Sequence, residues 1–292
     1  MSERWLIIRN GAVGDTVLLS SVICAIKKQH PDAWIEVMGV LERVALLVGD
    51  GLADCAVSAE RPGVESLYGE GALHSDLFDY FAEFSHILIY SAAASQQFVN
   101  RLKVRNGQWV CAYPALPQDN EQHITDFYLN PLRKMLGDET PQPVIHLYEE
   151  EKANAREELS KLSVQKGRRL IGVHPGAGGP AKQALPEKFL QEVDTIQGDK
   201  CLLIVKGPAD EDAVAALVER LPNGMEHHLL DQRPLRELAA LLSQCDQFIG
   251  NDSGVTHIAA ALGVPTSVFF LASDPAVWAP PGEHVQVMKI SD

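Results

Sequence analysis

Short apolar runs alternate along the chain with longer stretches in which apolar side chains recur at helical spacing. Runs that are apolar at nearly every position are typical of strands in a parallel sheet, because helices cover both faces of such a sheet. The pattern therefore predicts an α/β protein. The expected strands are residues 5–8, 34–38 and 87–90 in the first half, and 170–173, 201–205, 247–249 and 266–270 in the second.

The amphipathic stretches between these runs predict the helices. They are residues 16–29, 42–48, 95–104 and 123–136 in the first half, and 149–162, 186–196, 210–221, 234–243 and 255–262 in the second. Residues 61–73, rich in glycine and polar side chains, are expected to form a loop. This alternation is typical of doubly wound parallel sheets, which bind ligands beyond the carboxyl ends of their strands.

A polar stretch divides the chain near its middle. Residues 137–143 are rich in Gly, Asp, Glu, Thr and Pro, a composition typical of a connection. A length of 292 residues suits two domains of roughly 150 residues each. We therefore expect two Rossmann-like domains with doubly wound parallel sheets, formed by residues 1–145 and 146–292.

The charge and the cysteines exclude several classes of function. The formal net charge is −14, so we expect no nucleic-acid partner and at most peripheral contact with a membrane. The five cysteines are far apart and include no Cys-x-x-Cys pair. Neither a zinc site nor a redox pair is therefore expected, and the cysteines are interpreted as buried free thiols.

The sequence also bears on localisation. Its polar start runs directly into the apolar run 5–8, without the basic head and long apolar centre of a signal peptide. The most apolar long stretch, residues 258–272, is interrupted by Gly263 and Pro265 and is shorter than the ~20 residues that a membrane helix needs. We expect a cytoplasmic protein, whose place of action can be the inner face of the membrane.

Three turns follow predicted strands and precede predicted helices, at residues 9–16 (RNGAVGDT), 174–182 (HPGAGGPAK) and 250–257 (GNDSGVTH). In such a position, backbone N–H groups and the positive end of the helix dipole can bind an anion. The first turn matches neither the G-x-G-x-x-G of dinucleotide-binding proteins nor the P-loop. The turns therefore predict phosphate binding of another kind.

Each turn also has a simpler structural interpretation. Asp15 would cap the start of a helix, Lys182 would be solvated in a flexible loop, and His257 would be a hydrogen-bonded structural histidine. The third turn holds Asn, Asp and Ser in succession, although a helix start needs only one cap. Its remaining polar groups are available to bind a ligand.

Taken together, these turns resemble glycosyltransferase family 9, the ADP-heptose:lipopolysaccharide heptosyltransferases and their relatives. The resemblance rests on the first strand with Gly14-Asp15, on the H-P-G-A at 174–177 with Lys182, and on residues 250–265. It implies a GT-B fold, in which two Rossmann-like domains face a central cleft, and no metal or organic cofactor. The implied reaction is an inverting transfer from a nucleotide-diphosphate sugar, with ADP-heptose as the expected donor, to a saccharide acceptor of lipopolysaccharide or another surface glycan.

The resemblance also implies roles for single residues. Asp15 would be the general base that takes the proton of the acceptor hydroxyl. Lys182 would offset the diphosphate charge, and Asp252 would bind sugar hydroxyls or His257. Asp210 or Glu211 would reach the ribose. The implied donor-binding residues are Gly14, Thr16, His174, Gly176, Lys182, Asp252, Ser253, Gly254, Val255 and His257.

Two segments depart from the family pattern. Lys182 is followed by QALP where Lys-x-Trp-Pro is common, and Leu271-Ala272-Ser273 stands where Gly-Pro-Thr is usual. These differences leave open a protein of the same fold that binds a nucleotide sugar without transferring it. A nucleotide-sugar 2-epimerase is a further alternative, because the fold alone does not fix the chemistry.

Overall fold

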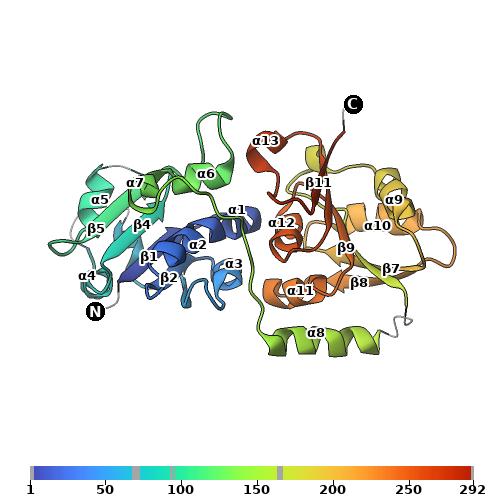
Figure 1. Ribbon diagram of the computed structural model, residues 1–292, viewed down its shortest axis with the longest axis horizontal. Helices are drawn as coiled ribbons and strands as arrows, with labels where there is room; N and C mark the ends of the chain where they lie inside the picture. Colours follow the sequence, from blue (N-terminus) through green and yellow to red (C-terminus); the bar gives the residue numbers. More distant parts are fainter. Residues whose placement is uncertain (1–2, 68–72, 93, 95, 163–166, 291–292) are drawn as a thin grey trace. The chain divides into compact units, whose positions relative to one another are not determined.

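The computed structural model describes residues 3–67, 73–92, 94, 96–162 and 167–290. The chain divides into two compact units, Met1–His146 and Leu147–Asp292. In Figure 1 the first unit is coloured from blue to green, and the second from yellow-green to red. Each unit is a parallel sheet with helices.

The first unit has a five-stranded sheet in the order β3-β2-β1-β4-β5, and all of its strand pairs are parallel. Its strands are β1 Arg4–Arg9, β2 Trp34–Gly39, β3 Cys55–Ser58, β4 His86–Tyr90 and β5 Trp109–Tyr113. On β1, Leu6 and Ile8 pack against Phe81, Phe84 and Ile87 in one apolar cluster. The central strand is therefore buried from its second residue onward, and its carboxyl end carries the turn that contains Asp15.

The helices of the first unit are shorter than expected. They are α1 Val13–Leu18, α2 Ser20–Gln29, α3 Leu41–Val44, α4 Ser75–Ala82, α5 Gln96–Leu102, α6 Ile124–Leu129 and α7 Arg133–Leu136, with 3-10 turns η1 Ala45–Leu47, η2 Val64–Leu67 and η3 Asn130–Leu132. The helix expected at 123–136 is interrupted at Pro131, because proline lacks the N–H that continues a helix. The helix expected from residue 16 begins earlier and breaks at Leu19. Part of the loop expected at 61–73 forms η2, and residues 68–72 lie outside the described residues, as does residue 95 at the start of another expected helix.

The second unit has a six-stranded parallel sheet in the order β11-β10-β9-β6-β7-β8. Its strands are β6 Arg169–His174, β7 Lys200–Lys206, β8 Glu226–Asp231, β9 Gln247–Asn251, β10 Thr266–Phe270 and β11 Val285–Lys289. Its helices are α8 Glu149–Lys161, α9 Pro186–Thr195, α10 Glu211–Glu219, α11 Leu235–Leu242, α12 Gly254–Ala261 and α13 Pro275–Trp278, with the 3-10 turn η4 Pro180–Lys182. The sheet reverses its order between β6 and β9, so the site is expected where these neighbouring strands end.

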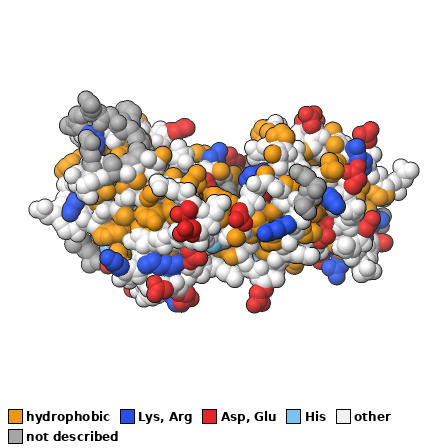
Figure 2. Space-filling model, turned by 90° about the horizontal axis from the view of Figure 1, so that it is seen from above, with side chains coloured by type: hydrophobic (Ala, Val, Ile, Leu, Met, Phe, Trp, Pro, Cys, Tyr) orange, Lys and Arg blue, Asp and Glu red, His pale blue; other side chains and the backbone are white. Residues whose placement is uncertain are grey.

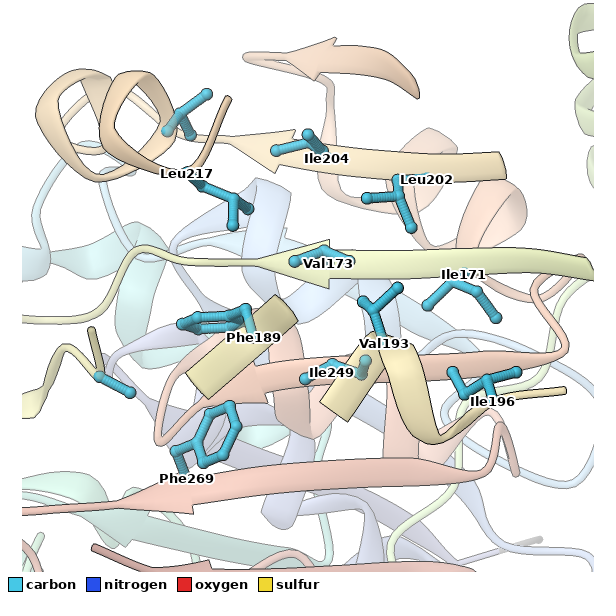
Figure 3. Close-up of a cluster of buried hydrophobic side chains, with 12 residues drawn as sticks. Ile171, Val173, Phe189, Val193, Ile196, Leu202, Ile204, Leu217, Ile249 and Phe269 are labelled. Carbon is cyan, nitrogen blue, oxygen red and sulfur yellow. The ribbon is translucent and has the colours of Figure 1, made fainter. Parts of the chain in front are cut away.

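Helices cover both faces of the second sheet. Ile171 and Val173 of β6 pack with Phe189 and Val193 of α9 (Figure 3). The residue between them, Gly172, faces the other side, where an added Cβ would lie 2.7 Å from the Phe248 ring and 3.2 Å from Leu242 of α11. The interior therefore has no space for a side chain at this glycine.

Four strands, β3, β5, β8 and β11, were not expected from the sequence, and all four are sheet edges. The helices α4 and α13 were not expected either.

No helix among the described residues is both long and apolar enough to span a membrane. On the face drawn in Figure 2, Lys and Arg side chains form small separate groups among Asp and Glu side chains.

Candidate active site

The second and third turns leave neighbouring strands at the same edge of the second sheet. β6 ends at His174 and pairs in parallel with β9, with His174 opposite Gly250. The carboxyl ends of parallel neighbours lie side by side, so the residues that follow these strands can interact directly. The two turns are therefore neighbours in the second sheet.

Asn251 joins the two turns. Its side chain is fully buried, and its Nδ2 donates to the carbonyl oxygens of Pro175 at 2.8 Å and Gly176 at 3.2 Å. Its Oδ1 accepts from the Ala184 N–H at 2.9 Å. A buried amide that is hydrogen-bonded at both ends fixes the backbone around it. Asn251 was not among the expected site residues, although the excess of polar groups in its turn was a signal.

His174 forms a second link between the turns. Its Nδ1 lies 3.0 Å from Ser253 Oγ, and its Nε2 lies 3.0 Å from Asp210 Oδ2. Because a carboxylate only accepts, Nε2 carries a proton, and in the neutral ring Nδ1 accepts from the Ser253 hydroxyl. The same Asp210 oxygen accepts the Gly207 N–H at 2.7 Å. The hydrogen bond from His174 lowers the pKa of Asp210, against the opposing effect of burial.

Asp210 also explains one glycine of the second turn. A Cβ added to Gly176 would lie 1.9 Å from Asp210 Oδ1, which is far inside van der Waals contact. A Cβ at Gly178 or Gly179 would meet no atom within 4 Å. Gly176 is therefore required for packing, whereas the turn has open space at the two following glycines. Glu211, the other residue expected near a ribose, has an exposed side chain and pairs with Lys206 at 2.6 Å.

Lys182 and Asp252 form an ion pair between the turns, with 2.6 Å between Nζ and Oδ2. The Ser273 hydroxyl donates to the same oxygen. His257 Nε2 lies 3.9 Å from the other oxygen, Oδ1. Ser273, in the segment that departs from the family pattern, thus places a hydroxyl at this site. The family pattern has a threonine at this position.

The start of α12 lies beside these groups. Ser253 is its N-cap, and its side chain accepts from the Thr256 N–H at 3.4 Å. The first N–H groups of a helix, here those of Gly254 and Val255, have no intrahelical acceptor and point toward the region before the helix. An open depression of about 420 Å³ lies next to Ser273, lined by residues 270–275 with Lys289 and Ile290. The second unit therefore offers hydrogen-bond donors and open space at the carboxyl ends of its strands.

In the first unit, Asp15 is not the helix N-cap that one interpretation of the sequence suggested. Helix α1 begins at Val13, so Asp15 is its third residue. Its Oδ2 accepts from the Ala12 N–H at 3.2 Å and from Arg9 at 3.0 Å. The sequence did not indicate the earlier start because Gly14, a poor helix former, stands in the first turn. The Asp15 side chain therefore accepts a hydrogen bond from the N-cap residue Ala12, and Asp15 is not itself the N-cap.

Arg9 and its neighbours hold this turn. Arg9 is 3% exposed and also donates to the Tyr128 hydroxyl at 3.1 Å. Burial, reinforced by the negative charge of Asp15, raises the pKa of Tyr128 above its ordinary value, so the hydroxyl remains neutral. The Thr16 hydroxyl is buried and donates to the Ala12 carbonyl at 2.9 Å. The Asp15 carboxylate is thus fixed by its neighbours while its side chain remains 18% exposed.

Comparison with known proteins decides the family. The model of glycosyltransferase family 9 (heptosyltransferase) matches residues 85–291. The chain belongs to this family. It is 24% identical to lipopolysaccharide heptosyltransferase 3 of Escherichia coli K12, over 93% of this chain and 83% of that protein. The protein is accordingly a heptosyltransferase-like glycosyltransferase.

Solved structures agree on the fold. A glycosyltransferase of family 9 from Veillonella parvula superposes with a TM-score of 0.77 at 20% identity, covering 99% of this chain and 87% of that one. The E. coli ADP-heptose lipopolysaccharide heptosyltransferase II gives 0.71 at 20% identity, covering 98% and 90%. The expected GT-B class, with two Rossmann-like units, is confirmed.

Proposed function

We propose that this glycosyltransferase transfers heptose from an ADP-linked donor to a saccharide acceptor of lipopolysaccharide or another surface glycan, with inversion and without a metal in the transfer step. The names of the relatives support the donor and the acceptor class, since one is a lipopolysaccharide heptosyltransferase and another acts with ADP-heptose. The observation that carries the proposal is the convergence of Lys182, Ser253 and the start of α12 at one edge of the second sheet.

Each group has a chemical task in this proposal. The acceptor hydroxyl oxygen attacks the anomeric carbon, the bond from that carbon to the diphosphate oxygen breaks, and ADP leaves with the electron pair. Asp15 takes the hydroxyl proton. Its Oδ2 is held by Ala12 and Arg9, which leaves Oδ1 to act as the proton acceptor.

The leaving diphosphate is stabilised by donors of the second unit. Lys182 supplies a positive charge, and the N–H groups of Gly254 and Val255 supply hydrogen bonds. His174, held by Asp210, accepts the hydrogen bond of the Ser253 hydroxyl and so fixes the N-cap residue of α12. In this proposal residues 146–292 bind the donor, residues 1–145 supply the base and the acceptor side, and the enzyme works in the cytoplasm at the inner face of the membrane.

The test is a donor screen followed by a transfer assay. A true donor at about 100 times its Kd should stabilise the protein by ~2.7 kcal/mol, so ADP-, UDP-, GDP- and dTDP-sugars are compared by thermal unfolding. Transfer is then measured with the best donor and a heptose-free lipopolysaccharide core, with and without a chelator. Preferred stabilisation by a UDP-sugar would contradict the ADP assignment, and loss of transfer on chelation in a protein that circular dichroism shows to be still folded would contradict the metal-independent mechanism.

A second candidate is a nucleotide-sugar binder that has lost transfer activity. The Leu271-Ala272-Ser273 segment beside Asp252 is the observation that favours it, because it replaces the Gly-Pro of the family pattern. Donor binding without release of ADP in the presence of acceptors would support this candidate. An epimerised nucleotide sugar formed without an acceptor would instead indicate an epimerase.

A further inference from the structure

A second cluster of polar side chains lies at the opposite end of the second sheet from the donor turns. Cys201 is the second residue of β7, and Glu226 and His228 lie on the edge strand β8. Cys201 pairs opposite Glu226, and Leu203 pairs opposite His228. Alternate residues of a strand point to the same face, so the three side chains share one face of the sheet.

The three side chains are close enough to share one ion. One potential ligand atom from each lies within 4.8 Å of the other two. His228 Nε2 and Glu226 Oε1 are 3.6 Å apart, which is too long for a good hydrogen bond. Zinc bonds of about 2.0–2.2 Å to nitrogen and oxygen would place two tetrahedral ligands roughly 3.4 Å apart. The spacing therefore fits two ligands of one ion better than a hydrogen-bonded pair.

The imidazole supports the same interpretation. His228 Nε2 is buried, and among the described residues it has no hydrogen-bond partner. A buried polar atom without a partner costs free energy, and a bound ion or water can supply that partner. A metal ion bound to this nitrogen would remove that cost.

Glu226 is already oriented for such a role. Arg168 pairs with its Oε2, which leaves Oε1 directed toward His228. The positive charge of Arg168 opposes the binding of a cation nearby. The negative charge of a thiolate ligand would offset this repulsion. Cys201 supplies the sulfur, opposite Glu226 on the neighbouring strand. A divalent cation that replaces the thiol proton would compensate both negative groups.

We propose that Cys201, Glu226 and His228 bind a thiophilic divalent metal ion of the zinc type, with water as the fourth ligand. Thiolate and imidazole select zinc and cobalt over magnesium and calcium. The ion joins the edge strand β8 to β7 and has no part in the transfer step. The sequence has no Cys-x-x-Cys motif to indicate this site, because its ligands come from two strands that are separated in the sequence.

Cobalt is the probe, because a cobalt–thiolate bond gives a charge-transfer absorption band. The full chain without an affinity tag is treated with a chelator and titrated with Co²⁺, and Zn²⁺ is then added to displace it. We expect the band to saturate at one Co²⁺ per chain, to be abolished in Cys201→Ala and to persist in Cys245→Ala, a matched variant at another buried thiol of this unit. No band, or a band lost in Cys245→Ala and kept in Cys201→Ala, would overturn the proposal.

A second variant guards against loss of folding. His228 is only partly buried on an edge strand, so His228→Gln should fold, and circular dichroism checks this. Even supporting residues around a metal change its affinity by about 10- to 100-fold, so loss of a direct ligand should weaken Co²⁺ at least on the order of 100-fold. Unchanged affinity in a folded His228→Gln would also refute the site. Because transfer is not measured, either result leaves the proposed function untouched.

Discussion

Lys182 Nζ lies 2.6 Å from Asp252 Oδ2, so the lysine expected to bind the diphosphate is already paired with a carboxylate of the neighbouring turn. The Asp252 side chain is 8% exposed and that of Lys182 is 39% exposed. An ammonium group has three donors, so Lys182 can keep Asp252 and also donate to a phosphate oxygen. The pair holds the lysine in place before the donor binds, which reduces the ordering cost of binding.

We predict that Lys182→Ala weakens donor binding by about 10- to 100-fold. A hydrogen bond to a charged group contributes about 1.5–3 kcal/mol, and each 1.4 kcal/mol is tenfold in affinity. Isothermal titration with ADP measures the change. The variant also removes a partner of the buried Asp252 carboxylate, so the free energy of unfolding is measured alongside it.

Lys188→Ala is the matched control for this prediction. Lys188 is an exposed lysine of α9, so its removal changes the net charge equally without touching the turns. Its donor affinity should remain that of the wild type. Equal weakening in both variants would mean that overall charge, and not the Lys182–Asp252 pair, determines donor affinity.

Asp15→Asn should lower kcat by about 10²- to 10⁴-fold, which is the usual contribution of a general base. Donor affinity should be nearly unchanged, because most of the proposed donor contacts belong to the second unit. The structure adds a cost in stability: Arg9 is buried and would lose its charged partner, which should lower the free energy of unfolding by about 1.5–3 kcal/mol. Steady-state kinetics and urea unfolding measure the two effects.

Arg9→Met separates the two effects of this substitution. It breaks the same ion pair while the Asp15 carboxylate remains. We expect a similar loss of stability and a smaller loss of kcat than in Asp15→Asn. If Asp15→Asn and Arg9→Met had the same free energy of unfolding and the same loss of kcat, Asp15 would act only by holding Arg9.

The sequence indicated the interior of each sheet but not its edges. The seven expected strands correspond to β1, β2, β4, β6, β7, β9 and β10, which all have a strand on both sides. The missed strands are the edges, where side chains are partly exposed. The edge strand β8 has the sequence EHHLLD, which contains no long apolar run. Its strand conformation depends on pairing with β7, which is a contact that no local pattern records.

The site could be predicted only to the level of its turns. Strand, polar turn and helix are adjacent in the sequence, so their order predicts candidate turns for anion binding. The bonds that organise the site are not local: Asn251 contacts Pro175 and Gly176, and His174 contacts Asp210 and Ser253. Such pairings arise only when β6 and β9 lie side by side. Asn251 was therefore missed, and the contact of Asp210 with His174 was not foreseen.

Gly176→Ala should destabilise the protein by about 1–3 kcal/mol, the usual cost of inserting a methyl group into a packed site. The added Cβ would lie 1.9 Å from Asp210 Oδ1, so the carboxylate would have to move away from His174. Gly178→Ala is the matched control, because no atom lies within 4 Å of its added Cβ. Urea unfolding compares the two, and equal stabilities would contradict the observed packing.

The last prediction concerns the pH dependence of stability through Asp210. The hydrogen bond from His174 lowers the pKa of this carboxyl in the folded protein. A group with a lowered folded pKa stabilises the fold above its unfolded pKa, which is about 3.9 for aspartate, and this contribution is lost as the pH falls through the folded value. Asp210→Asn removes the charge and retains the shape. The free energy of unfolding should therefore differ most from that of the wild type near neutral pH, and the difference should shrink below about pH 4.

The control for this prediction is Glu211→Gln, the neighbouring carboxylate, whose side chain is 75% exposed. Exposed ion pairs contribute little, so its difference from the wild type should be small at every pH. Urea unfolding at a series of pH values between neutral and acid compares the three proteins. If the Asp210→Asn difference grew toward acid, the carboxylate would be destabilising in the folded protein. His174 would then have to be held in place by Ser253 alone.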